Sequence, residues 1–232
     1  MQKVLITGGN KGIGFATTTC FLHHGYHIVI VARDFSAFPL HEPQVQQVRF
    51  DLRHYRDIPR LVSEIGAIDI LVNKAGILPA LPYDNYPVDT VDDIIAVNLR
   101  APVALIQAFA PGMVQRQSGR IVNVASIAGH IGHPDIWYGI TKAGVINATK
   151  SFAKILSPHG IPVNCVAPGP VEETVMFQGI PDARKDQILA SVISGRFATP
   201  TDVAETVYWL ATQAPTYITG ICVDINNGAF LR

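Results

Sequence analysis

The chain has 232 residues, of which 48% are hydrophobic and 16% charged, and its 18 basic and 18 acidic side chains cancel. A neutral chain of this kind gives no reason to expect nucleic acid or an anionic membrane as a partner. No apolar run approaches the ~20 residues of a membrane span, and no leader-like segment precedes the first predicted strand. With three scattered cysteines, these features predict a cytoplasmic protein, and the low charge favours a homo-oligomer.

Seven short runs rich in valine, isoleucine and leucine predict strands, and helical segments separate most of them. The predicted strands span residues 3–7, 27–32, 45–50, 68–73, 120–126, 161–167 and 221–225, and the predicted helices span 13–24, 55–65, 90–117, 136–156 and 201–212. Apolar strands that alternate with helices are typical of a parallel sheet covered on both faces. We therefore expect a single α/β domain over residues 1–232, with a Rossmann-type, doubly wound parallel sheet.

Two segments break the alternation. Residues 34–44 contain two prolines and are short, so the second crossover helix should be stunted or absent. Residues 168–196 form a long connection with an amphipathic stretch at 182–193. Such a connection, placed beyond the carboxyl end of a strand, predicts a substrate lid over residues 170–196.

The first predicted strand runs into a glycine-rich turn, TGGNKGIG, at residues 7–14. Gly8, Gly12 and Gly14 would let the backbone approach a pyrophosphate, and the following helix offers its free N–H groups. The spacing matches neither the commonest dinucleotide fingerprint nor a Walker loop. Its place between a strand and a helix nevertheless favours dinucleotide binding over a plain turn.

The second strand is followed by Arg33 and Asp34, which bear on the choice of dinucleotide. A cation near the adenosine ribose favours the 2′-phosphate of NADP(H), and Lys11 in the glycine turn is a second cation. An inward-facing Asp34 carboxylate would instead favour NAD(H) by binding the ribose hydroxyls. We expect NADP(H), with NAD(H) as the alternative.

Tyr138 and Lys142 are four residues apart in a predicted helix, so their side chains share one face. With Asn98 and Ser126 they occur in the order and at the spacing of the catalytic residues of the short-chain dehydrogenases/reductases, a family that the chain resembles over essentially its whole length. The resemblance also rests on the glycine turn and on three further motifs: Asp51-Leu52, Asn73-Lys74-Ala75-Gly76 and Pro168-Gly169.

The resemblance implies a role for each of these residues. Tyr138 would exchange a proton with the substrate oxygen, Ser126 would hydrogen-bond that oxygen, and Lys142 would favour the phenolate and hold the nicotinamide ribose. Asn98 would position a water that relays protons to Lys142. The cofactor would contact Gly8, Asn10, Lys11, Gly12, Ile13, Gly14, Arg33, Asp51, Leu52, Asn73, Ala75, Gly76, Tyr138, Lys142, Pro168, Gly169, Val171 and Thr174.

Two positions depart from the family pattern. Lys74 replaces an asparagine that helps to hold the neighbouring strand end near Thr7, and a lysine cannot accept that hydrogen bond. After Gly169, either Glu173 or Thr174 would contact the nicotinamide carboxamide, and we favour Thr174.

The substrate should be a small carbonyl or alcohol compound, bound between Ser126, Tyr138 and the lid. The candidates for the pocket wall are His130, His133, Trp137 and Met176. Packing in the core, or contact with solvent, is the competing interpretation for the loop residues among them. We expect no metal at this histidine pair, nor at a second cluster formed by His23, His24 and His27.

The sequence as a whole predicts a ketone reductase that uses NADPH. An NAD-dependent alcohol dehydrogenase and a redox sensor that binds a dinucleotide without turnover are the alternatives. The complete catalytic set argues against a sensor, which has no need of a proton donor. The apolar helices around Asn98 and Tyr138 pack across a two-fold axis in relatives, which favours a homodimer or homotetramer.

Overall fold

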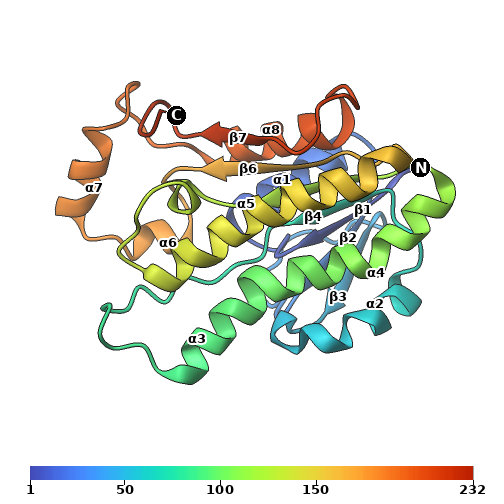
Figure 1. Cartoon of the computed structure of the whole chain (residues 1–232), viewed down its shortest axis with the longest axis horizontal. Helices are drawn as coiled ribbons and strands as arrows, with labels where there is room; N and C mark the ends of the chain where they lie inside the picture. Colours follow the sequence, from blue (N-terminus) through green and yellow to red (C-terminus); the bar gives the residue numbers. More distant parts are fainter. Residues whose placement is uncertain (232) are drawn as a thin grey trace.

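A computed structural model describes residues 1–231 of the chain, and its centre is one parallel sheet of seven strands (Figure 1). The strands are β1 (Lys3–Thr7), β2 (His27–Ala32), β3 (Val45–Arg49), β4 (Ile70–Asn73), β5 (Arg120–Val124), β6 (Val163–Pro168) and β7 (Cys222–Ile225). Their order across the sheet is β3-β2-β1-β4-β5-β6-β7. The predicted Rossmann-type, doubly wound sheet is therefore confirmed.

The strand order reverses between β1 and β4, and this reversal creates the crevice in which such sheets bind ligands. Thr7 ends β1 opposite Val31 of β2, and Asn73 ends β4 opposite Asn123 of β5. The residues after these strands therefore meet along one edge of the sheet.

Alternate residues of each strand face opposite layers of helices. On β1, Leu5 packs with the core under α2 and α4, whereas Val4 and Ile6 pack with the core under α1 and α8. The helices are α1 (Gly12–His23), α2 (Ile58–Ile65), α3 (Val88–Ile95), α4 (Ala101–Arg116), α5 (Ile136–Leu156), α6 (Val175–Gln178), α7 (Asp182–Leu189) and α8 (Pro200–Thr212). Short 3₁₀ segments add η1 (Leu52–Asp57), η3 (Ile127–Gly129) and η4 (Ser157–His159).

The predicted helix 90–117 is observed as one continuous helical stretch from Val88 to Arg116. Its middle, η2 (Ala96–Arg100), is a π-helical turn. By length and composition alone this stretch could cross a membrane, but half of its most apolar window is buried inside the protein. Such burial is typical of a core helix packed on a sheet. The expectation that no apolar segment has the length of a membrane span is therefore wrong for this stretch, although its burial is that of a core helix.

Both predicted irregular segments are confirmed. Residues 33–44, between β2 and β3, contain no helix. The connection between β6 and α8 carries the two short helices α6 and α7, which form an outlying layer (Figure 1).

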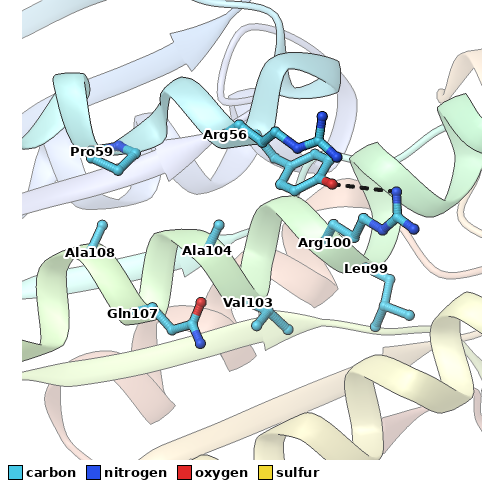
Figure 2. A pocket seen from close by; sticks show the side chains of 9 residues that line it. Arg56, Pro59, Leu99, Arg100, Val103, Ala104, Gln107 and Ala108 are labelled. Atoms are coloured by element: carbon cyan, nitrogen blue, oxygen red, sulfur yellow. Dashed lines mark hydrogen bonds between the residues drawn. The ribbon is translucent and has the colours of Figure 1, made fainter.

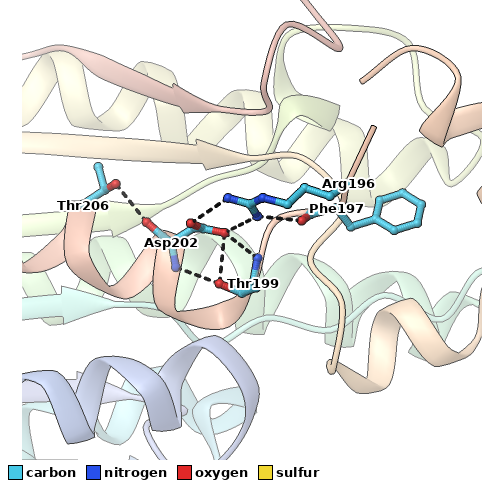
Figure 3. A network of polar contacts seen from close by, with 5 residues as sticks. All are labelled: Arg196, Phe197, Thr199, Asp202 and Thr206. Carbon is cyan, nitrogen blue, oxygen red and sulfur yellow. Dashed lines mark hydrogen bonds and ion pairs between the residues drawn. The ribbon is translucent and has the colours of Figure 1, made fainter. Parts of the chain in front are cut away.

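The segment predicted to be a lid, residues 170–196, ends at a network of polar contacts that joins it to α8 (Figure 3). Arg196 lies 2.8 Å from the Asp202 carboxylate, and the same carboxylate accepts a hydrogen bond from the Thr199 amide. Thr199 and Asp202 form a capping box, in which each side chain binds the other residue's backbone N–H. The network fixes where the lid rejoins the sheet-covering helices.

Candidate active site

The residues predicted to be catalytic converge where β4, β5 and α5 meet. Tyr138 and Lys142 lie one turn apart on α5 and are 8% and 4% exposed. The Lys142 Nζ donates a 2.8 Å hydrogen bond to the carbonyl of Val124, the last residue of β5, and lies 5.6 Å from the Tyr138 ring centre. The structure therefore brings both side chains into one interior corner, as their spacing predicts.

Asn98 lies in the π-helical turn between α3 and α4. Its Oδ1 accepts a 2.8 Å hydrogen bond from the Ile77 amide, and its Nδ2 donates to the Ile77 carbonyl at 2.9 Å. A methyl group added at Gly76 would lie 3.4 Å from Asn98 Oδ1 and 3.5 Å from Lys142 Nζ, so both side chains border this glycine. Single π-turns inside α-helices occur frequently at functional sites. The water relay through Asn98 stays a prediction.

Asp135, which the sequence analysis overlooked, holds the start of the catalytic helix. It is 3% exposed, and its Oδ1 accepts a 2.9 Å hydrogen bond from the Tyr138 amide as the N-cap of α5. Its Oδ2 accepts from the Ala80 amide at 3.0 Å. An aspartate directly before the first residue of a predicted helix is an N-cap signal, and this pattern could have identified Asp135.

Burial raises the pKa of the Tyr138 phenol, the neighbouring Ser126 hydroxyl lowers it by hydrogen bonding, and the Asp135 charge raises it. The net shift is upward, because an apolar interior disfavours the phenolate. The expectation that Lys142 favours the phenolate applies together with a positively charged oxidised nicotinamide, and it stays a prediction. Tyr138 is therefore held as a neutral proton donor at neutral pH, which suits reduction of a carbonyl.

Lys74 and Lys142 form a row of cations with Lys11. Burial and Lys74 lower the pKa of Lys142 to about 8, while burial and Lys11 lower the pKa of Lys74 to about 8. The hydrogen bond that Lys74 was expected to lose is made by the backbone: the amides of Lys74 and Ala75 each donate to Thr7 Oγ1 at 3.0 Å. The Lys74 side chain lines the cavity of the crevice.

The crevice itself contains a cavity of about 320 Å³ between the ends of β1, β2 and β4. Predicted cofactor contacts line it, namely Gly8, Asn10, Lys11, Arg33, Asp51, Leu52, Ala75 and Gly76. Gly8 has a φ of +66°, which favours glycine, and a methyl group at Gly14 would overlap the Gly8 carbonyl. This cradle fits a dinucleotide phosphate bridge, which approaches the backbone directly.

Asp34 and Arg33, the two residues that bear on the choice between NADP(H) and NAD(H), differ in their contacts. The Asp34 carboxylate accepts hydrogen bonds from the amide and hydroxyl of Ser36, at 2.9 and 2.8 Å, and these bonds hold its pKa below its usual value. Arg33 is exposed at the cavity wall and contributes to lowering the pKa of Asp51. The Asp34 carboxylate is thus hydrogen-bonded within its own turn, whereas the Arg33 side chain is available to bind a phosphate.

Further predicted cofactor contacts lie around the end of β6. Pro168 ends that strand, and the Gly169 amide donates to the Ile225 carbonyl at 2.9 Å. Thr174 is the N-cap of α6, and its methyl group would touch a Cβ at Gly12 from 3.5 Å. The first turn of the lid therefore lies against the glycine turn. The remaining predicted contacts, Ile13, Asn73 and Val171, lie in the same part of the fold.

The four candidates for the substrate pocket separate in the structure. His133 lies beside Tyr138, with 5.4 Å between ring centres. Trp137 is half-buried next to it, and Met176 is 39% exposed on the lid. His130 turns away: its ring stacks on Phe230, and its Nε2 faces β7. The structure thus places His133, and not His130, next to the catalytic tyrosine.

A second hollow, of about 530 Å³, lies between η1, α2 and α4 (Figure 2). Arg56 and Arg100 border it, and Arg100 donates a 3.4 Å hydrogen bond to the Tyr55 hydroxyl. Apolar side chains and Gln107 complete its wall, so it lacks an acid–base pair and we assign it no chemistry.

Fold and site together define a nicotinamide-dinucleotide oxidoreductase with a tyrosine–lysine catalytic pair. Residues 8–229 match the family model described as enoyl-(acyl carrier protein) reductase. The chain belongs to the short-chain dehydrogenase/reductase family.

Similar proteins agree with that assignment. The 3-oxoacyl-[acyl-carrier-protein] reductase FabG of Staphylococcus aureus is 33% identical over 99% of this chain and 98% of its own. The crystal structure of the 3-oxoacyl-[acyl-carrier protein] reductase of Brucella melitensis superposes with a TM-score of 0.90 at 28% identity, covering 100% of this chain and 92% of that one. ElxO with NADP bound superposes at 0.86 with 30% identity, over 98% of both chains.

Proposed function

We propose that this protein is an NADPH-dependent reductase that converts a 3-oxoacyl thioester, or a similar small ketone, into the alcohol. The observation that carries the proposal is the buried corner in which Tyr138 is held protonated beside Lys142 and Ser126. The choice of substrate class follows the relatives, several of which are 3-oxoacyl-[acyl-carrier-protein] reductases.

NADPH would supply the hydride at the substrate carbonyl carbon. The residues of this chain would supply the hydrogen bond, the proton and the stabilising charge. Ser126 hydrogen-bonds the substrate oxygen, which gains negative charge as the carbonyl is reduced. Tyr138 donates its phenolic proton to that oxygen, and Lys142 stabilises the phenolate that remains until a proton returns.

The preference for NADPH over NADH is supported by side chains of two loops, the glycine turn after β1 and the turn after β2. Arg33 and Lys11 place cations at the cavity wall, where a 2′-phosphate needs them. The Asp34 carboxylate, which would bind the ribose hydroxyls of NADH, is held by Ser36. An NAD-dependent alcohol dehydrogenase is therefore less favoured by the side chains around this cavity.

We also propose a cytoplasmic homodimer or homotetramer. Apolar side chains on α5 remain exposed in the single chain, with Ile140 at 51% and Ile155 at 61%. A second copy packed on α4 and α5 would bury them. Light scattering coupled to size-exclusion chromatography would give the oligomeric state directly.

The test begins with binding of NADPH and NADH, followed by loss of nicotinamide absorbance with 3-oxoacyl thioesters, ketones and aldehydes. We expect NADPH to bind more tightly and a 3-oxoacyl thioester to be reduced. Tyr138→Phe should retain NADPH binding and lose activity by roughly 10³-fold or more. Turnover that survives in Tyr138→Phe would contradict the mechanism, and binding without turnover of any carbonyl would favour the redox sensor.

A further inference from the structure

A cluster of three potential metal ligands lies outside the catalytic corner, at the edge of the sheet formed by β7. Cys222 and Asp224 are two residues apart on this strand, so their side chains project from the same face. His130, from the loop after η3, approaches that face and is the third member. Thiol, imidazole and carboxylate come together here from positions 92 residues apart in the chain.

The two distances from His130 Nε2 have the dimensions of a tetrahedral site. Cys222 Sγ lies 3.6 Å from His130 Nε2, which lies 3.3 Å from Asp224 Oδ1, and all three ligand atoms are within 4.8 Å of one another. Zinc bonds of about 2.3 Å to sulfur and 2.0–2.1 Å to nitrogen or oxygen, at tetrahedral angles, separate such ligand atoms by about 3.3–3.6 Å. The three ligand atoms could therefore share one zinc ion with little movement.

The arrangement differs from a hydrogen-bonded catalytic triad. In a triad the nucleophile and the carboxylate use different nitrogens of the histidine ring. Here Cys222 and Asp224 both face Nε2, and one ring nitrogen has a single proton or a single lone pair to offer. Three ligand atoms that converge on one point can all coordinate one cation, whereas they cannot all hydrogen-bond to the same ring nitrogen.

The surroundings favour a site that is closed and stable. The side chains of His130 and Asp224 are 11% and 22% exposed, and Cys222 is buried. Phe230 stacks on the His130 ring at 5.8 Å between centroids. Cys165 is the register partner of Cys222 on β6, which adds a second sulfur to the neighbourhood.

We propose that His130, Cys222 and Asp224 bind a structural zinc ion, with a fourth position left to water or a further ligand. Thiolate and imidazole ligands select zinc over magnesium or calcium, and binding releases the thiol proton of Cys222. His130 follows η3, whose N-cap is Ser126, so the ion would tie the loop that carries Ser126 to the edge strand. The sequence analysis expected no metal at His130, because neither partner is near it in the chain.

The test measures metal content of the untagged, reduced full-length protein after incubation with zinc and gel filtration. We expect about one zinc ion per chain, and affinity reduced roughly tenfold or more in Cys222→Ser and His130→Ala. Cys20→Ser and His41→Ala are matched controls on exposed or half-buried positions away from β7 and should retain the ion. Chelation should lower the melting temperature by roughly 5 °C.

Cobalt substitution provides a readout that needs no variant to fold. Wild-type protein with Co²⁺ should show a thiolate-to-metal charge-transfer band and the intense visible bands of tetrahedral coordination. Less than a tenth of an equivalent of bound zinc, absence of the charge-transfer band, or equal loss of zinc in the two control variants would each overturn the proposal. These outcomes do not depend on the reductase activity, so either proposal can fail alone.

Discussion

The two ends of the dinucleotide crevice use charge in opposite ways. At the catalytic end, Tyr138 and Lys142 are buried, and burial shifts the pKa of each. The Tyr138 amide donates to the Asp135 carboxylate, and the Lys142 ammonium donates to the Val124 carbonyl. At the adenosine end, the cations Lys11 and Arg33 are exposed and border the cavity. A group that must gain or lose a proton is held in the interior, where its pKa can be tuned, whereas a group that only attracts a phosphate works at the surface.

The largest effect in this comparison is expected from a substitution at the catalytic end that lowers kcat and leaves NADPH affinity unchanged. Ser126→Ala removes the hydroxyl that would stabilise charge on the substrate oxygen, so kcat should fall roughly 10²- to 10³-fold. NADPH affinity, measured by fluorescence titration, should stay within about twofold of wild type. A fall in affinity that matches the fall in kcat would mean that Ser126 positions the cofactor and not the oxygen.

Asp135→Ala tests whether the catalytic end depends on its helix cap. The substitution removes the acceptor of the buried Tyr138 amide and of the amide of exposed Ala80, and the free energy of unfolding should fall by roughly 1–3 kcal/mol. Asp135→Asn keeps an acceptor for one amide and should recover about half of this loss. Chemical denaturation of both variants gives the comparison, and equal stability of the two would show that the cap is not the cause.

Arg33→Ala tests the adenosine end. Loss of a charge-assisted contact to the 2′-phosphate should weaken NADPH binding roughly 10- to 100-fold, while NADH binding changes little. Arg60→Ala, an exposed position on α2 that does not line the cavity, is a matched control. If both dinucleotides weaken equally, Arg33 supports the loop and does not read the phosphate.

Replacement of Lys74 should have the smallest effect, and it should change both the catalytic end and cofactor binding. The pKa of Lys142 is about 8, so reductase activity should fall as the pH rises through about 8 and Lys142 loses its proton. Lys74→Met removes one cause of that depressed pKa and should move the falling limb to higher pH. It should also weaken NADPH binding several-fold, because a cation is lost from the cavity wall.

The exposed residue Lys150, on the same helix as Lys142, provides the control for Lys74. Lys150→Met should leave both the pH profile and NADPH affinity unchanged. A pH limb that does not move in Lys74→Met would show that burial alone sets the pKa of Lys142.

The same two lysines should affect folding. A pKa lowered from 10.5 in the folded state means that the unfolded chain binds more protons between pH 8 and 10.5. Stability without cofactor should therefore rise with pH across this window, and the rise should be smaller in Lys74→Met.

Sequence patterns were sufficient for features that depend on local order. The strands, the missing helix at 34–44 and the shared face of Tyr138 and Lys142 follow from periodicity and proline content, which act within a few residues. The glycine turn could likewise be interpreted from its place between β1 and α1.

Other features required atoms that are distant in the chain. The engagement of Asp34 by Ser36 depends on loop geometry, and the π-turn at Asn98 depends on how one long helix packs. The position of His130 beside β7 depends on contacts with a strand that lies 92 residues away in the chain. The sequence by itself determined the family and the parallel sheet, and it predicted four catalytic residues, since these rest on residue type and spacing. Only the tertiary structure decided which charges are buried, which are engaged and which side chains meet, because desolvation and long-range contacts exist only once the chain has folded.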